Sequence, residues 1–206
     1  MRVRLRLLLP ILAAAAALSA PAAQAGLISG VVGVVLPTCG TSTHPFAQFG
    51  DFNGYYPLAN NGFENGSAGW TLSGAGISKD NEPWLVNGPG RYALALPPGA
   101  SATSPGVCIN LLDPFFRMFA KSNGANGPLK VQVYFYGLTG NLTGILNVES
   151  FGPSGYSSWA PTGTIPSVLA LPLLTRYAQL RVTSGATSGS WQIDDVFVDP
   201  CIGRIG

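Results

Sequence analysis

Two adjacent acids near the end of the chain are the first candidates for chemistry. Asp194 and Asp195 interrupt a stretch, 190–200, that is otherwise rich in β-branched and aromatic residues and ends at a proline. Its apolar residues fall on both parities of an extended chain, which is typical of a strand covered on both faces. A carboxylate buried there without a partner would cost a large amount of free energy. The pattern therefore predicts that these acids have a partner.

The second candidate is an alternation of tyrosines with aliphatic residues in two stretches, 129–136 and 176–183. Alternate side chains of a strand point to opposite faces, so the aliphatic residues and Phe135 would point to a core. The others would share one outer face if the strands share a sheet. Arg117 is a further candidate, although its stretch, 115–121, has apolar residues on both parities. The expected face comprises Gln132, Tyr134, Tyr136, Tyr177, Gln179 and Arg181, with Arg117.

Such a face suits a carbohydrate ligand. Aromatic rings stack on the C–H faces of sugars, and amide and guanidinium groups hydrogen-bond to hydroxyls. The alternative interpretation is an ordinary solvated sheet face whose tyrosines cover the backbone.

Catalytic chemistry has little support in the sequence. A nucleophile–histidine–acid triad would need His44, the only histidine, and the one G-x-S-x-G-like string, 185–189, has threonine in place of serine. One histidine and three scattered cysteines do not indicate zinc, and no phosphate-binding glycine motif is present. Asp80, Glu82 and Glu149 could supply a hydrolytic carboxylate pair, but each is more simply interpreted as a solvated loop acid. No catalytic residue is predicted.

The elements that must position these residues are predicted to be β-strands. Charged residues make up 10% of the chain, and 27 glycines and 17 prolines separate its short apolar stretches. Beyond the N-terminus, no window free of Gly and Pro has helical spacing. This pattern predicts a single all-β domain, a sandwich or barrel. Strands are expected at 70–76, 83–86, 91–96, 103–111, 115–121, 129–136, 142–148, 167–171, 176–183 and 190–199.

Residues 1–25 have the form of a secretory signal peptide. Three arginines precede a short apolar run, and an Ala-Gln-Ala cleavage site follows at 23–25. The alternative, an uncleaved membrane anchor, needs about 20 apolar residues. We expect a secreted, extracellular protein with an apolar and aromatic lead-in at 26–59, a sandwich domain at 60–200 and a tail at 201–206.

Loss of the signal changes the charge balance. The signal holds three of the 11 Lys and Arg residues and none of the nine acids, so eight basic residues remain against nine acidic ones. No nucleic-acid partner and no membrane span after signal cleavage are therefore expected.

Three cysteines, Cys39, Cys108 and Cys201, allow one intramolecular disulfide and leave one thiol over. The sequence does not choose among the three pairings. A Cys39–Cys201 bond would join the ends of the domain, whereas Cys39–Cys108 would tie the N-terminal segment to an early strand.

Two motifs together carry a resemblance to a known fold family. They are Asn61-Gly62-Phe63-Glu64 followed by Gly69-Trp70, and Ile193-Asp194-Asp195-Val196 near the end. The pair resembles galactose-binding-like jelly rolls, including carbohydrate-binding modules of the family 4, 9 and 22 type, and implies a jelly-roll β-sandwich. Intervening stretches, such as 94–105 and 114–117, are similar to a group of small secreted bacterial proteins. Cysteines at the positions of Cys39 and Cys108 are usual in that group, so the resemblance implies this disulfide.

The same resemblance implies a structural calcium ion. In the carbohydrate-binding relatives, the glutamate after Phe and one aspartate of the pair bind calcium, which takes about 6–8 oxygen ligands. Carried over, the metal ligands would be Glu64 with Asp194 or Asp195, completed by backbone carbonyls near Asn61 and Ser67. The other interpretation places one aspartate in solvent, while the other pairs with Arg176 or with backbone N–H groups.

The expected function is that of a non-catalytic module that binds extracellular or cell-wall glycan. A structural or adhesive envelope protein that acts through protein contacts at the cell surface is an alternative, favoured by the apolar segment 26–36 and by Cys201. A glycosidase or lyase on a jelly-roll scaffold, with Glu82 as a candidate acid, is the third. The oligomeric state is not predicted.

Overall fold

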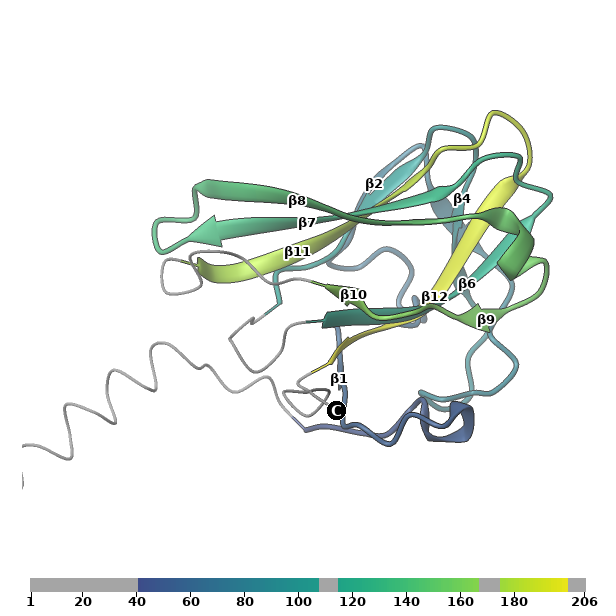
Figure 1. The fold of residues 1–206 in the computed structure, drawn as a ribbon, viewed down its shortest axis with the longest axis horizontal. Coiled ribbons are helices and arrows are strands. Elements are labelled where there is room, and N and C mark those ends of the chain that lie inside the picture. Colours follow the sequence, from purple (N-terminus) through teal and green to yellow (C-terminus); the bar gives the residue numbers. More distant parts are fainter. Residues whose placement is uncertain (1–40, 108–114, 167–174, 200–206) are drawn as a thin grey trace, which may run out of the picture.

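The computed structural model describes residues 41–107, 115–166 and 175–199, which form a β-sandwich of two antiparallel sheets (Figure 1). The predicted all-β jelly-roll sandwich is therefore confirmed. The predicted signal peptide, all three cysteines and therefore the predicted disulfide, the segment 26–36 and the strand expected at 167–171 lie outside the described residues. Among the residues that are described, no helix is long and apolar enough to cross a bilayer.

One sheet has seven strands and the other has five. The seven-stranded sheet has the order β10-β6-β12-β4-β3, with β1 paired to β12 and β9 to β6. The five-stranded sheet has the order β2-β5-β11-β7-β8. Its long strands β7, β8 and β11 form the upper layer in Figure 1, over β6, β10 and β12. The first six strands are β1 Tyr56–Pro57, β2 Thr71–Ser73, β3 Gly76–Ser78, β4 Ala93–Leu96, β5 Ser101–Thr103 and β6 Phe115–Asn123. The others are β7 Leu129–Gly137, β8 Leu142–Phe151, β9 Ala160–Pro161, β10 Ile165–Pro166, β11 Thr175–Ser184 and β12 Ser190–Asp199, with short 3₁₀ helices η1 Ala47–Phe49 and η2 Pro153–Tyr156.

Apolar residues that alternate along the long strands build the core between the sheets. In β7, every second residue from Leu129 to Phe135 is buried, and β11 does the same from Ala178 to Val182. These side chains meet Phe116 and Met118 of β6 in one continuous cluster. Burial of such side chains contributes about 1.5–3 kcal/mol each to folding.

A second apolar cluster covers the other face of the seven-stranded sheet. Phe46 and Tyr55, from the segment before residue 60, are fully buried against Phe119 of β6 and Phe197 of β12. Strand β1 from the same segment pairs with β12. The sandwich therefore includes residues upstream of 60, and β12 is covered on both faces, as its sequence predicts.

Three predicted strands differ in the structure. Of the described residues in the stretch predicted at 103–111, only the first, Thr103, belongs to β5, and residues 104–107 lie outside the strands. The stretch 70–76 is divided between β2 and β3, which belong to different sheets, and Gly74 between them has φ +67°. The stretch 83–86 forms a turn in place of a strand, with Leu85 at φ 53°. The Glu82 carboxylate accepts the backbone N–H groups of Trp84 at 2.6 Å and Val86 at 2.8 Å, which fixes that turn.

Candidate functional site

The six polar and aromatic residues expected on β7 and β11 do share one sheet face. In the antiparallel register, Tyr136 lies opposite Tyr177, Tyr134 opposite Gln179, and Gln132 opposite Arg181. All six are partly exposed, while the residues between them are buried in the core. We call these six residues the tyrosine face: Gln132, Tyr134, Tyr136, Tyr177, Gln179 and Arg181. It is the outer face of the five-stranded sheet.

The aromatic rings of the tyrosine face are held in place by their neighbours. The Tyr136 and Tyr177 rings stack with centroids 4.7 Å apart and planes 9° apart. Gly106 lies against the Tyr177 ring so closely that a Cβ at that position would be 2.9 Å from Cδ2. Burial raises the pKa of the Tyr136 hydroxyl, and the neighbouring Tyr177 and Tyr134 raise it further. The hydroxyl therefore stays protonated, able to donate a hydrogen bond.

The polar groups of the tyrosine face are also oriented by hydrogen bonds. The Gln132 amide donates from Nε2 to Asn147 Oδ1 at 2.6 Å, and Gln179 Nε2 donates to the Ser104 carbonyl at 2.9 Å. Arg181 Nη2 donates to Ser101 Oγ at 2.9 Å, and its guanidinium lies 6.0 Å from the Tyr134 ring centroid. Because these side chains are already ordered, they lose less conformational entropy when a ligand binds.

Strand β8 extends the face with residues that sequence reasoning missed. Ile145 lies opposite Tyr134, and Leu142 lies opposite Tyr136. Each is 48% exposed, so together with the tyrosines they give one end of the face an apolar surface. Apolar and polar residues alternate only weakly along β8, because a β-bulge interrupts the register near each end of its pairing with β7.

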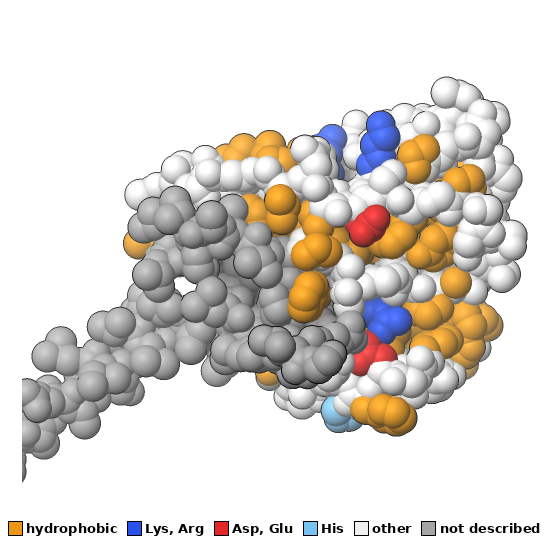
Figure 2. Space-filling model, viewed as in Figure 1, with side chains coloured by type: hydrophobic (Ala, Val, Ile, Leu, Met, Phe, Trp, Pro, Cys, Tyr) orange, Lys and Arg blue, Asp and Glu red, His pale blue; other side chains and the backbone are white. Residues whose placement is uncertain are grey.

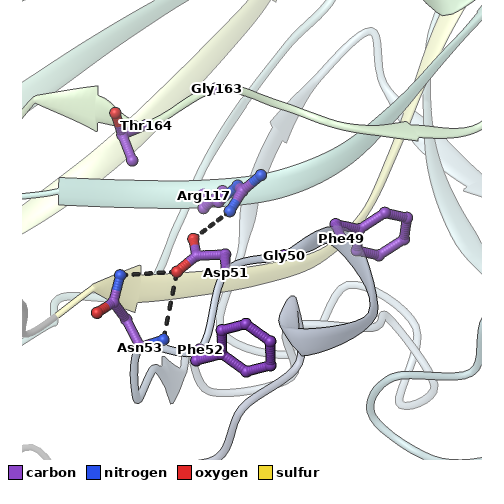
Figure 3. A pocket seen from close by; sticks show the side chains of 8 residues that line it. All are labelled: Phe49, Gly50, Asp51, Phe52, Asn53, Arg117, Gly163 and Thr164. Atoms are coloured by element: carbon purple, nitrogen blue, oxygen red, sulfur yellow. Dashed lines mark hydrogen bonds and ion pairs between the residues drawn. The ribbon is translucent and has the colours of Figure 1, made fainter.

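Arg117 does not belong to the tyrosine face. It lies on β6, which pairs with β12 in the seven-stranded sheet, and apolar clusters cover both faces of that strand. Its guanidinium forms an ion pair with Asp51, donates from Nε to the Thr162 carbonyl at 2.8 Å, and lies 4.3 Å from the Phe46 ring centroid. Arg117 lines an open depression of about 610 Å³ (Figure 3). Its other lining residues are Phe49, Gly50, Asp51, Phe52, Asn53, Gly163 and Thr164.

The two aspartates of β12 form a buried acidic cluster with Glu82. Asp194 is fully buried, Asp195 is 4% exposed and Glu82 is fully buried. Asp194 Oδ2 accepts the Glu82 backbone N–H at 3.1 Å, and Asp194 Oδ1 accepts the Asp195 N–H at 2.9 Å. The interpretation of Glu82 as a solvated loop acid is therefore wrong. In the sequence, Glu82 is an isolated acid before Pro83, and nothing around it indicates that its side chain is buried beside Asp194.

The acidic cluster raises the pKa values of both aspartates. Burial raises the pKa of Asp194 to about 9, and the charge of Asp195 adds to the rise. Burial also raises the pKa of Asp195, with further contributions from the Glu82 and Glu64 carboxylates. The interpretation with one aspartate in solvent does not hold, since neither is exposed.

Glu64 lies at the margin of the acidic cluster. It is exposed, and its Oε1 accepts the backbone N–H groups of Arg91 at 2.7 Å and Tyr92 at 3.0 Å. Gly62 lies directly over the acids, because a Cβ there would be 2.8 Å from Asp195 Oδ1. The motif that begins at Asn61 thus brings the chain to the acidic pair.

The donor set of the acidic cluster has the chemistry that calcium prefers. Its groups are carboxylate oxygens with no cationic side chain bonded to them among the described residues. As the side chains lie, no three His, Cys, Asp or Glu residues in the described ranges are arranged to hold one metal ion. An ion would therefore have to draw the carboxylates together.

Solved structures with this fold include carbohydrate-binding modules. The chain matches no protein-family model and no curated protein sequence. Over 69% of its length, it is similar to the CBM22-1 and GH10 modules of a Clostridium thermocellum endo-1,4-beta-D-xylanase complexed with xylohexaose, with 15% identity and a TM-score of 0.50. That match covers 28% of the xylanase chain.

Two further matches have lower TM-scores. A CBM22-1 xylan-binding domain from Paenibacillus barcinonensis has 15% identity over 68% of this chain and 90% of its own, with a TM-score of 0.45. The enzymatically active domain of tailspike protein 4 from bacteriophage CBA120 has 15% identity over 69% of this chain and 21% of its own, with a TM-score of 0.49. At 15% identity, the match to the xylanase modules shows a shared fold alone.

Proposed function

We propose that this protein is a secreted, non-catalytic module that binds extracellular or cell-wall glycan through the tyrosine face. The observation that carries the proposal is the register of β7 and β11. It sets Tyr136 against Tyr177 and Tyr134 against Gln179 on one outer face. An aromatic surface bordered by oriented amide groups is what a sugar with one apolar and several hydroxylated sides requires.

The surroundings of the candidate catalytic acids support a binding role. Glu82 is fully buried, and both of its carboxylate oxygens accept backbone N–H groups of the turn that follows it. Asp80 forms an ion pair with Lys121. Burial alone would raise the pKa of Asp80, but hydrogen bonds from Lys121 and Trp159 lower it. A general acid needs an exposed carboxyl group with a raised pKa, whereas Glu82 is buried and the pKa of Asp80 is lowered.

A glycan array followed by titration calorimetry tests this proposal. We expect the double variant Tyr134→Ala/Tyr136→Ala to lose binding by about 10-fold or more, since each lost stacking contact costs on the order of 1 kcal/mol. The matched control is Phe52→Ala, which removes a ring that is 76% exposed and lies in the depression beside Arg117. Unchanged binding by the tyrosine double variant, with its melting temperature preserved, would remove the site assignment.

We also propose that the acidic cluster binds a structural calcium ion. Asp194, Asp195 and Glu82 would supply carboxylate oxygens, with Glu64 and backbone carbonyls at the margin. The ion would neutralise carboxylates that otherwise repel one another in a buried site. Its role would be to fasten the segment near Asn61 to β12.

Thermal unfolding with calcium and with a chelator tests this second proposal. We expect calcium at about 100 times its Kd to stabilise the protein by about 2.7 kcal/mol. The variant Asp195→Asn should abolish that response while the fold persists, because Asn tolerates the left-handed backbone that Asp195 adopts at φ 45°. Equal melting temperatures of the wild type with calcium and with chelator would exclude the ion.

A further inference from the structure

The end of the five-stranded sheet opposite the apolar residues carries two cations. Lys130 lies opposite Thr183 on the outer face, and Arg181 lies opposite Gln132, so the two are diagonal neighbours across β7 and β11. Such neighbours are about 7–8 Å apart at their backbones. Neither forms an ion pair within the described part of the chain. Figure 2 shows Lys or Arg side chains at the upper margin of the molecule, on the side of the five-stranded sheet.

Among the described residues, no carboxylate on these strands forms an ion pair with either cation. Glu149 of β8 is the only acid in the five strands β2, β5, β7, β8 and β11. It lies at the β-bulge opposite Val131, is exposed, and its Oε1 accepts the Ser150 backbone N–H at 3.1 Å. Lys130 and Arg181 therefore outnumber the acids on these strands.

Hydrogen-bond donors surround the cations. Thr103 lies opposite Arg181 on β5, and Thr71 lies opposite Thr103 on β2, which continues a row of hydroxyls across the sheet. The bond to Ser101 Oγ holds Arg181 with one of its five N–H donors, leaving the planar guanidinium fixed beside Tyr134. A fixed guanidinium recognises carboxylate or sulfate oxygens better than neutral hydroxyls.

We propose that the ligand of the tyrosine face is an acidic glycan whose carboxylate or sulfate groups bind Arg181 and Lys130. This inference rests on the proposed glycan-binding function. Sugar rings lie on Tyr134, Tyr136 and Tyr177, and the anionic substituents reach the two cations at the other end of the face. The closely spaced pair of cations suits a polymer that carries repeated negative charges.

The experiment compares three polymers at low and high salt by titration calorimetry: polygalacturonate, dextran sulfate and neutral xylan. The variant is Lys130→Gln/Arg181→Gln, and the matched control is Lys79→Gln, which removes an exposed cation beyond the end of β3 in the other sheet. We expect at least one acidic polymer to bind about 10-fold more tightly than xylan. That advantage should shrink with salt, disappear in the double variant and persist in the control. The polymer that loses affinity identifies carboxylate or sulfate as the group recognised.

Other outcomes separate this inference from the function on which it rests. Binding of xylan as tight as that of both acidic polymers, with loss only in the tyrosine double variant, overturns the acidic ligand and leaves the glycan-binding face intact. An equal loss in Lys79→Gln also overturns it, since the effect would then be bulk charge. No binding of any polymer by the folded wild type contradicts both proposals. Circular dichroism and melting temperature establish that each variant is folded.

Discussion

At the scale of single residues, Asp195 explains how β12 holds two acids in an apolar strand. Its φ of 45° coincides with a break in the register between β12 and β6, from Asp194 to Phe197. There β12 turns to the chain before β2, since Leu58 N donates to the Val196 carbonyl at 3.1 Å and Val196 N donates to the Asn61 carbonyl at 3.3 Å. The bulge thus re-aims the acids toward Gly62 and Glu82.

The raised pKa values of the acidic cluster predict a pH dependence of stability. Both aspartates have folded-state pKa values above their ordinary value of 3.8, with that of Asp194 at about 9. The folded state therefore binds more protons than the unfolded state at intermediate pH, and this contribution to stability is lost as pH rises. With chelator present, we expect the free energy of unfolding to fall between about pH 5 and pH 8 in urea titrations.

The double variant Asp194→Asn/Asp195→Asn is the control for that prediction, because it removes the two titrating groups and leaves the Glu82 and Glu64 carboxylates in place. Its pH profile should be flatter than that of the wild type over the same range. A wild-type stability that rises through this range would contradict the raised pKa values.

At the scale of elements, the short helix η1 and the chain around it seal the outer face of the seven-stranded sheet. The fully buried Phe46 ring lies 5.3 Å from the Phe119 ring and 4.8 Å from the Tyr55 ring. The Arg117 guanidinium covers Phe46, and the ion pair with Asp51 fixes that guanidinium. Arg117 is therefore a residue that anchors the N-terminal segment.

Phe46→Ala should destabilise the protein by about 3–5 kcal/mol, because it removes a fully buried aromatic ring and leaves a cavity. Phe52→Ala, in the same segment but 76% exposed, should change stability by no more than about 0.5 kcal/mol. Chemical denaturation of the two variants in parallel measures the difference. Similar values for both would mean that the segment does not pack as described.

At the scale of the whole molecule, the sandwich has two buried layers of side chains, where two sheets alone would bury only the layer between them. The core lies between the sheets, the aromatic cluster of Phe46 and Tyr55 covers one outer side, and the tyrosine face forms the other. Phe46 and Tyr55 are fully buried, whereas the three tyrosine rings of the tyrosine face are partly exposed. One outer side therefore contributes to stability, and the other is the proposed glycan-binding surface.

A chain that begins at residue 60 should be less stable than one that begins at residue 41. The shorter chain lacks Phe46, Tyr55 and β1, so Phe119 and Phe197 lose their cover. We expect a loss of about 3 kcal/mol or more in the free energy of unfolding, measured by urea titration, with stronger binding of a hydrophobic dye. Equal stability of the two chains would place the start of the domain at residue 60.

The sequence by itself determined the long strands β7, β11 and β12 and, in β7 and β11, the residues that face the core. Alternation in β7 and β11 fixed Val133 and Leu180 inward and Tyr134 and Gln179 outward, because a one-residue slip would expose the whole apolar set. It also marked β12 as a strand covered on both faces. These are local properties, readable from the spacing of residue types along a single strand.

The tertiary structure alone decided which strands share a sheet and which distant groups meet. Arg117 was a candidate for the tyrosine face, yet the pairing of its strand β6 with β12 places it in the other sheet. Glu82 lies 112 positions from Asp194 in sequence, and only folding puts its backbone against that acid. Side-chain periodicity along one strand contains no information about its neighbours, so the acidic partner of β12 and the cationic end of the outer face could not be predicted from it.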